Sequence, residues 1–434
     1  MGETDQFRLD FEWQDPGGAR GADLRATWGS LCIHFGAACI SELQDRRSRS
    51  VRRQVCLPLY PLAEWLACNW WFLTTETECR GVKAPEFDRR HNLRWAREGF
   101  ALPSLSIISL GDSTELRWEQ WEVPDTGIKF LSRGVGRLPC SQLAEVLGEF
   151  VGAVAGRLLD SGIQDTLLQS EWQAITTCDE AERTYCRAAA QLGVDPYAAT
   201  PLVEAQLLDA AASIRPELLN ELLALSSVTS LTADTVRLRQ ATSAIADDTS
   251  NVDALVRIRR VLSAVHGAGT AWEKGYGYAA IARSALGGEN WKSSTLEQLA
   301  DRLQIDQLEH LLLPAGDACG VFDAVLGFNS CGNPRWLLQR KNQTSQQFTF
   351  CRALFEYLVG REGSFSTVSR LRTERQQMSR AFAAEFLAPK EMLRQDLSGS
   401  WVTEEEIDDL ATEYGVSPFV IRHQVENHNL AHVA

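Results

Sequence analysis

The sequence predicts an α+β protein with several domains, and three observations lead to this prediction. A chain of 434 residues is too long for one ordinary hydrophobic core, so two or three domains are expected. Strand-like alternation of apolar and polar residues is concentrated in the first 160 residues, whereas residues 163–265 carry apolar side chains at helical spacings. Hydrophobic residues make up 44% of the chain without a run of about 18 in succession, which indicates a globular protein without a membrane span.

The first residues, the cysteines and the net charge limit the cellular location and the partners that we expect. The first residues have neither a basic end nor an apolar core, so we expect no secretory signal and a cytoplasmic location. Eleven cysteines are scattered without a Cys-x-x-Cys pair, which favours buried thiols over disulfides. A net charge of -14 disfavours extensive binding of nucleic acid across the surface, although a local basic binding site is still compatible with it.

Residues 1–160 are predicted to form a Trp-rich α+β domain of unknown role. Gly111 lies in a turn sequence between two of the expected strands, which favours a hairpin. Eight of the thirteen tryptophans precede residue 125, and we interpret them as core in preference to a ligand cage. The expected strands are Phe7–Trp13, Leu105–Leu110, Glu115–Trp121 and Phe130–Val135, and the expected helices are Leu59–Leu73 and Ser141–Leu159.

Residues 161–266 are predicted to form a helical spacer domain. Apolar residues recur there every three or four positions, and prolines mark several helix starts. Residues 233–248 are small, polar and poorly periodic, so we expect a loop or a mobile connection there. The expected helices are 167–175, 180–192, 202–213, 216–225 and 252–265.

Two local clusters of chemically active side chains stand out in the first domain. Five arginines lie within eight residues and predict either a contact for phosphates or an acidic partner, or a solvated connection; they are Arg46, Arg47, Arg49, Arg52 and Arg53. Cys32, His34 and Cys39 form a tight Cys/His group, but zinc needs a fourth ligand and the group lies in an apolar run. We therefore predict no metal at this group.

Two short sequence segments in the last third of the chain share a residue pattern with a known family. The first runs from Phe348 to Leu358, and the second from Gln376 to Pro389. They resemble the two active-site helices of the ImmA/IrrE family of bacterial metallopeptidases, and the resemblance extends over about residues 268–430. It implies a mostly helical, zincin-like domain with a small sheet, which we assign to residues 267–434.

The resemblance also implies that the zinc site is degenerate. In the family a helix carries His-Glu-x-x-His, whose histidines lie on one helix face and bind zinc while the Glu activates a water. Aligning the flanking phrases places Arg352 and Glu356 at the two His positions, Ala353 at the general base and Gln376 at the third ligand. A protonated guanidinium has no lone pair to donate, so we expect no catalytic residue, metal or cofactor. Arg352 and Glu356 are expected to form an ion pair across one helical turn.

The tail has the spacing of a helix-turn-helix, with Leu410 and Ile421 as apolar positions and Gly415 at the turn. A DNA-reading unit needs basic residues around it. The first of these helices instead carries six carboxylates, namely Glu404, Glu405, Glu406, Asp408, Asp409 and Glu413. We therefore expect the unit to pack against the peptidase-like core.

These features favour a catalytically inactive ImmA/IrrE-like protein. By resemblance, its relatives cleave repressors or antitoxins in stress, mobile-element and phage-related regulation. The expected role is that of a protein-binding subunit or sensor in a bacterial defence, toxin-antitoxin or mobile-element regulatory complex. The partner would be another protein, bound through the peptide groove or the Trp-rich domain. The alternatives are a diverged active metallopeptidase, with Glu356, Glu374 and a distant His as ligands, and a DNA-binding transcriptional regulator.

Overall fold

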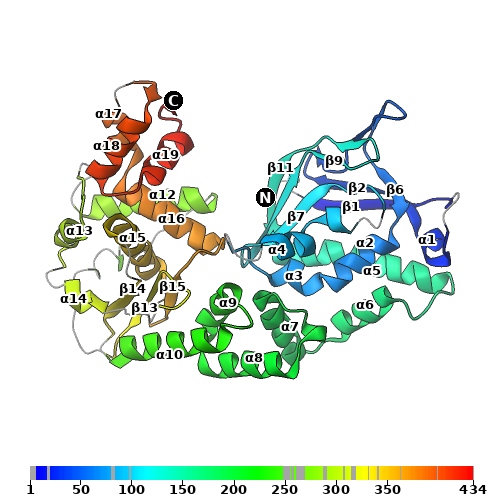
Figure 1. Ribbon diagram of the computed structural model, residues 1–434, viewed down its shortest axis with the longest axis horizontal. Coiled ribbons are helices and arrows are strands. Elements are labelled where there is room, and N and C mark those ends of the chain that lie inside the picture. Colours follow the sequence, from blue (N-terminus) through cyan, green and yellow to red (C-terminus); the bar gives the residue numbers. More distant parts are fainter. Residues whose placement is uncertain are drawn as a thin grey trace. The chain divides into compact units, whose positions relative to one another are not determined.

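The computed structural model describes residues 6–433 except for 17–19, 80–83, 97–98, 248–254, 256–258, 261–268, 287–290, 306–307, 314–318, 331, 340–341, 362 and 398. The chain divides into two compact units, Met1–Thr200 and Pro201–Ala434 (Figure 1). Both units contain helices and sheet, which confirms the predicted α+β, multi-domain class. The three-domain division stays a prediction, and the boundary between the two units falls inside its helical middle segment.

The N-terminal unit contains antiparallel sheets built from short strands. In the first sheet β2 is central, with β1 on one side and β3 and β6 on the other. The other two sheets have the strand orders β5-β4-β10-β9 and β11-β8-β7. The strands are β1 (Phe7–Trp13), β2 (Trp28–Phe35), β3 (Ala38–Cys39), β4 (Leu43–Asp45), β5 (Ser50–Arg52), β6 (Val55–Pro58), β7 (Ser104–Ser109), β8 (Ser113–Glu119), β9 (Trp121–Val123), β10 (Ile128–Phe130) and β11 (Gly134–Pro139).

Helices cover one side of these sheets and enclose the core of the N-terminal unit. The longest, α5, buries a stripe that includes Leu143, Leu147 and Val154, three of the residues whose spacing predicted it. The helices are α1 (Ala22–Ala26), α2 (Tyr60–Cys68), α3 (Trp70–Thr75), α4 (Ala84–His91), η1 (Leu93–Trp95), α5 (Cys140–Asp160), α6 (Leu167–Thr177), α7 (Glu180–Leu192) and η2 (Pro196–Ala198).

Several local predictions for this unit are confirmed, and two are wrong in extent. The β7–β8 hairpin forms around Gly111, whose φ of 105° suits a glycine. The expected helix 59–73 is interrupted at Asn69 and becomes α2 and α3. The expected strand 130–135 is divided between β10 and β11. Of the eight early tryptophans, three are buried in the core, four are half-buried and Trp95 is exposed, so the interpretation as core is confirmed for the buried ones, namely Trp70, Trp71 and Trp118.

The C-terminal unit begins with helices and continues into a small sheet enclosed by further helices. The helices are α8 (Pro201–Ser213), α9 (Pro216–Leu225), α10 (Leu231–Asp247), α12 (Ala271–Ala285), α13 (Leu296–Arg302), α14 (Leu308–Leu311), α15 (Gln343–Val359), α16 (Glu374–Leu387), α17 (Lys390–Asp396), α18 (Glu404–Tyr414) and α19 (Pro418–Asn427). The strands are β12 (Leu312–Leu313), β13 (Ala324–Phe328), β14 (Pro334–Leu338), β15 (Ser366–Val368), β16 (Trp401–Val402) and β17 (His432–Val433).

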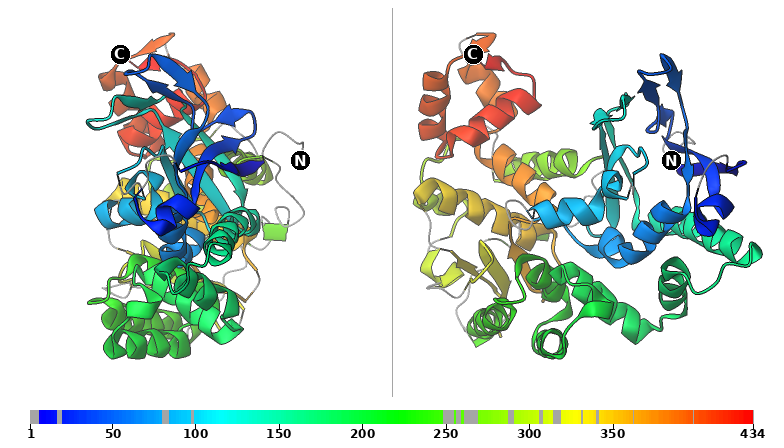
Figure 2. Two further views of the ribbon diagram at one scale, coloured as in Figure 1. Left: turned by 90° about the vertical axis from the view of Figure 1, so that its right-hand side faces the viewer. Right: turned by 45° about the vertical axis from the view of Figure 1, so that its right-hand side comes forward.

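The small sheet has the order β12-β14-β13-β15, so β15 lies at its edge. Helix α15 packs against β13 and β15 on one side and against α16 on another. Helices α12 and α16 lie side by side in the views of Figures 1 and 2. They approach closely at Gly275, where a Cβ would lie 2.5 Å from the carbonyl oxygen of Met378, so a larger residue there would separate them.

The expected loop at 233–248 is wrong, because α10 occupies most of it. Its buried face combines Leu238, Ala241 and Ile245 with the polar side chains of Asp234 and Thr235. Small and polar residues on the buried face weaken the hydrophobic periodicity, which explains the error. The expected helix at 252–265 lies largely outside the described residues. Among the helices that the structure describes, none combines the length and the apolar character that a bilayer crossing requires.

Candidate functional site

The four residues that the sequence alignment assigned to a degenerate zinc motif lie on α15 and α16, beside the edge strand β15. Arg352, Ala353 and Glu356 are on α15, and all three are buried. Gln376 is in the first turn of α16, where the side chain of Thr373 caps the helix by accepting a hydrogen bond from the Gln376 backbone N–H. Ala353 belongs to the hydrophobic core, whereas the other three belong to one polar network.

Arg352 is held by partners from three parts of the unit. Its Nη2 donates to Oε1 of Gln376 at 2.6 Å and to the carbonyl of Ser369 at 2.8 Å. Its Nε donates to Oγ of Ser379 at 3.3 Å, and its Nη1 lies 3.5 Å from a carboxylate oxygen of Asp323. Burial lowers the pKa of Arg352, but the surrounding carboxylates oppose this shift, and the group stays a cation. A positive charge therefore stands at the position that the sequence alignment assigned to the first zinc ligand.

Gln376 uses both ends of its amide in the network. Its Oε1 accepts from Arg352 and from the backbone N–H of Ser369 at 3.1 Å. Its Nε2 donates to the carbonyl of Thr367 at 2.8 Å and to both carboxylate oxygens of Glu221 at 3.2 Å. The donors around Oε1 and the acceptors around Nε2 fix the orientation of the amide. The Oε1 atom of Gln376 therefore already accepts two hydrogen bonds.

Glu356 pairs with Arg375 on α16, so the predicted pair between Arg352 and Glu356 is wrong. Arg375 Nη1 donates to Oε2 of Glu356 and its Nη2 donates to Glu221, which lets one guanidinium bridge two carboxylates. Burial raises the pKa of Glu356 to about 7 although Arg375 opposes the shift. In the described part of the chain no donor reaches Oε1 of Glu356. The i and i+4 residues share a helix face, but each finds its partner on another element.

The same side chains occupy the outer edge of β15. The Val368 carbonyl accepts from the Asp323 N–H on the side of β13, so the carbonyls of Thr367 and Ser369 face the opposite way. Gln376 and Arg375 donate to the Thr367 carbonyl, and Arg352 and Arg380 donate to that of Ser369. These carbonyls are therefore not free to pair with a peptide added as a further strand.

Sequence reasoning missed three members of this network: Glu221, Asp323 and Arg375. Glu221 lies on α9, in the segment assigned to a spacer, and its side chain is only 11% exposed. A signal for Glu221 was present, because it stands beside Leu218 and Leu222 on a strongly apolar helix. A carboxylate at such a position needs a buried partner. The sequence gives no comparable signal for Asp323.

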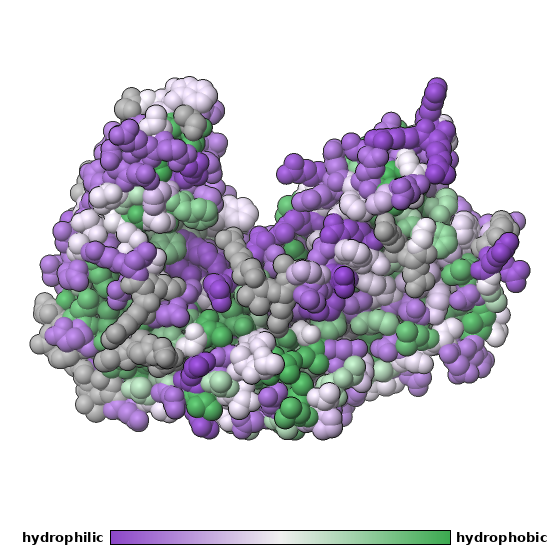
Figure 3. Space-filling view, in the orientation of Figure 1, coloured by the Kyte–Doolittle hydropathy of each residue, from purple (hydrophilic) through white to green (hydrophobic). Residues whose placement is uncertain are grey.

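The five arginines predicted as contacts lie on the exposed hairpin formed by β4 and β5, which we call the arginine hairpin (residues 43–53). Arg46 makes a bidentate pair with Glu122 at 2.7 and 3.1 Å, and Arg52 lies 4.0 Å from Asp45. Within the described ranges no carboxylate pairs with Arg47, Arg49 or Arg53. The projecting blue hairpin of Figure 1 corresponds to a strongly hydrophilic protrusion in Figure 3.

The helix-turn-helix spacing of the tail is confirmed as α18 and α19. Gly415 ends α18 in the left-handed conformation, with a φ of 62°. Gln424 on α19 donates to Glu385 at 2.7 Å and to the carbonyl of Ala388 at 2.9 Å, and all three groups are buried. The unit therefore packs against α16, as the sequence predicted.

Comparison with known proteins finds a family whose model matches part of the C-terminal unit. Residues 336–426 match the IrrE N-terminal-like domain family. The match begins within β14, continues through α15, β15, α16, α17, β16 and α18, and ends in α19; we call this part the IrrE-like segment. It confirms the resemblance inferred for the C-terminal part, whereas the resemblance of residues 268–335 stays a prediction. Comparisons with curated proteins and with solved structures found no match.

Proposed function

We propose that this chain is a catalytically inactive IrrE-like protein that acts as a protein-binding subunit or sensor in a bacterial defence, toxin-antitoxin or mobile-element regulatory complex. The observation that supports the loss of catalysis most directly is the set of bonds around Arg352. Arg352, a cation with no lone pair, is aligned with the first zinc ligand, and Gln376, aligned with the third, accepts a hydrogen bond from it. A dication at this place would be repelled.

A diverged metallopeptidase is the first alternative, and the positions of its suggested ligands weigh against it. Glu356 is engaged by Arg375, and Glu374 lies 3.0 Å from the ammonium of Lys274. Each carboxylate would have to leave a cation before it could coordinate zinc. A ligand set of two engaged carboxylates and one histidine is therefore a poor site.

A DNA-binding regulator is the second alternative, and the charges of the tail weigh against it. Arg422 is a basic residue of α19, and its guanidinium is paired with the carboxylate of Glu404 on α18. The carboxylates of α18 would approach the phosphates together with it. The tail therefore supports a packing role.

The proposed partner contact is the arginine hairpin. The occupied carbonyls along β15 disfavour binding of a partner as an added strand beside α15 and α16. The hairpin instead offers three arginines that no carboxylate of the described residues pairs with, on a chain with a net charge of -14. A protein with an acidic surface fits this site better than nucleic acid, because the rest of the chain would repel a long polyanion.

Two experiments test the proposal. The purified chain, supplied with zinc and a mixture of denatured proteins, should cleave no more than its Glu356→Gln variant. Zinc-dependent cleavage that disappears in this variant would contradict the loss of catalysis.

The second experiment tests the partner. A tagged chain purified at low salt from its native host should retain a stoichiometric protein. The triple variant Arg47→Glu, Arg49→Glu, Arg53→Glu should lose that protein, whereas the control Arg25→Glu, an exposed arginine on α1, should keep it. Purification of the unmodified chain alone, or equal retention by both variants, would refute the contact.

A further inference from the structure

A second polar cluster lies on the first sheet of the N-terminal unit, away from any motif of the family. Cys32 and His34 are two residues apart on β2, so their side chains point to the same face of the sheet. Leu31 and Ile33 point to the other face and are fully buried in the core. Cys39 on β3 pairs with His34 across the two strands, which brings its thiol to the face that carries Cys32.

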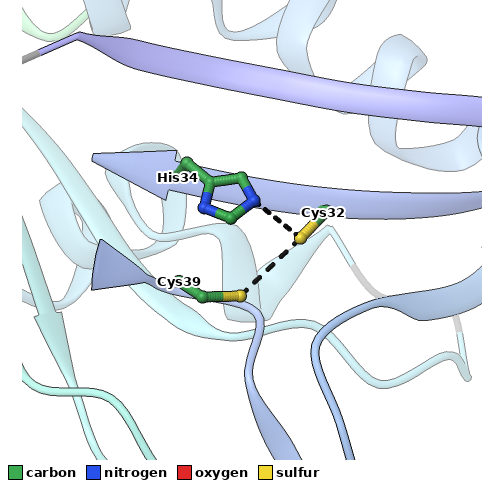
Figure 4. A group of neighbouring side chains, drawn as sticks. All are labelled: Cys32, His34 and Cys39. Carbon is green, nitrogen blue, oxygen red and sulfur yellow. Dashed lines mark hydrogen bonds between the residues drawn. The ribbon is translucent and has the colours of Figure 1, made fainter. Parts of the chain in front are cut away.

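The three side chains converge, as Figure 4 shows. The Sγ atom of Cys32 lies 2.9 Å from Nε2 of His34 and 3.6 Å from Sγ of Cys39. Two sulfurs bound to one tetrahedral zinc at about 2.3 Å lie about 3.8 Å apart, and a sulfur and an imidazole nitrogen lie about 3.5 Å apart. The sulfur separation already fits such a centre, and the ring of His34 would have to withdraw by only about 0.6 Å.

A fourth ligand is available on the neighbouring strand. Asp10 on β1 stands directly opposite Cys32, so its side chain lies on the same face. Its carboxylate oxygen is 3.9 Å from Nε2 of His34, and the side chain is 57% exposed and can change rotamer. The sequence did not reveal this ligand, because strand pairing alone places Asp10 beside the group.

We propose that Cys32, His34, Cys39 and Asp10 bind a thiophilic divalent metal ion of the Zn²⁺ type. Two thiolates, one imidazole and one carboxylate are ligands that zinc accepts in tetrahedral geometry. Binding releases the two thiol protons, since thiolates are the coordinating form. The ion would join β1, β2 and β3, and it would therefore fasten the edge strand nearest the N-terminus to the centre of the sheet.

The polar groups around the cluster suit this role. The carbonyl of Arg53 accepts from Sγ of Cys32 at 3.1 Å, from Sγ of Cys39 at 3.2 Å and from Oγ of Ser41 at 2.7 Å. After deprotonation of the thiols, the Ser41 hydroxyl remains as a donor to this carbonyl. A disulfide between Cys32 and Cys39 is the competing chemistry, because the sulfurs are near, but it leaves His34 and Asp10 without a role.

The experiment uses the full chain, purified under reducing conditions without a histidine tag and then loaded with Zn²⁺ or Co²⁺. Elemental analysis should find one zinc per chain, and Co²⁺ should give the visible bands of tetrahedral thiolate coordination. Cys32→Ser and Cys39→Ser should each lower the affinity by more than about 100-fold, since loss of even an outer-shell partner costs about 10–100-fold. Asp10→Asn should lower it by about tenfold.

Cys56→Ser is the matched control. Cys56 is an exposed thiol on β6, paired with Ser30, and it shares the sheet face with Cys32. This variant should bind metal like the unmodified chain, and circular dichroism should show that all variants fold. Absence of bound metal in the reduced chain, a Cys32–Cys39 disulfide that persists under reductant, or full binding by the Cys32→Ser, Cys39→Ser double variant would overturn the proposal. None of these outcomes bears on Arg352, so the test is independent of the proposed loss of catalysis.

Discussion

The IrrE-like segment and the first sheet of the N-terminal unit differ in opposite ways. The segment matches a known family, whereas the sheet brings possible metal ligands together. For the segment, the sequence alignment proposed Arg352, Ala353, Glu356 and Gln376 for the ligand and base positions of that family. The first sheet lies outside the matched residues 336–426, yet two thiols and an imidazole converge there. A fold is specified by its apolar packing, whereas metal chemistry depends on a few donor atoms, so one can be retained without the other. The predictions below test this contrast.

The largest expected effect is the loss of the guanidinium at the centre of the IrrE-like segment. Arg352→Ala should lower the free energy of unfolding of the C-terminal unit by about 3–5 kcal/mol, because Asp323, Gln376 and Ser369 lose a buried charged partner. Hydrogen exchange of α15 and α16 peptides in urea would measure it. The exposed Arg361→Ala variant should change this free energy by less than about 0.5 kcal/mol. Equal effects of the two variants would show that the network is not structural.

The next effect is a dependence on pH that originates at Glu356. In the folded chain the pKa of the Glu356 carboxyl is about 7, whereas its ordinary value is 4.5, because burial opposes the charged form. Unfolding therefore releases a proton between these values, and the stability of the C-terminal unit should fall as the pH rises from 4.5 to about 7. The loss should be on the order of 3 kcal/mol. Glu356→Gln should remove this slope, and a slope unchanged in that variant would assign it to another group.

Metal removal should separate the two regions. With free zinc about 100-fold above the dissociation constant, binding stabilises the folded state by about 2.7 kcal/mol. A chelator should therefore speed hydrogen exchange in peptides from β1, β2 and β3 and leave peptides from α15 and α16 unchanged. The reverse pattern would mean that the IrrE-like segment, and not the first sheet, holds the ion.

The smallest effect concerns the helix cap beneath Gln376. Thr373→Ala removes the side-chain acceptor for the Gln376 backbone N–H and should cost about 1 kcal/mol. Thr373→Ser keeps the hydroxyl and should restore most of the stability in the same exchange experiment. If Thr373→Ala costs as much as Arg352→Ala, the cap and the guanidinium act as one cooperative unit.

Local features of the fold were predictable from sequence, whereas contacts across the chain were not. The β7–β8 hairpin depends on a turn at Gly111, and α5 depends on apolar spacing, so both were found. The motif phrases located Arg352 and Gln376 on neighbouring helices. Periodicity failed at α10 because its buried face mixes Ala241 with polar residues.

The partners at both clusters come from segments that are distant along the chain. Glu221 on α9 joins a network centred on α15 and α16, and Asp10 joins Cys32 through strand pairing. Sequence reasoning assigned a partner for Arg352 within the same helix, because that pair is visible without a fold. At Cys32, His34 and Cys39 it expected no metal, because no fourth ligand is adjacent in the sequence. The wrong pair at Arg352 follows from long-range geometry that spacing does not encode.

The occupied carbonyls of β15 have a consequence for the behaviour of the chain at high concentration. An exposed sheet edge is a template on which strands of other molecules can add, and this is a common route to aggregation. Here Arg352, Arg375, Gln376 and Arg380 cap the outer carbonyls of the edge strand. These four side chains therefore also protect the sheet edge against self-association, and their removal should expose the protein to it.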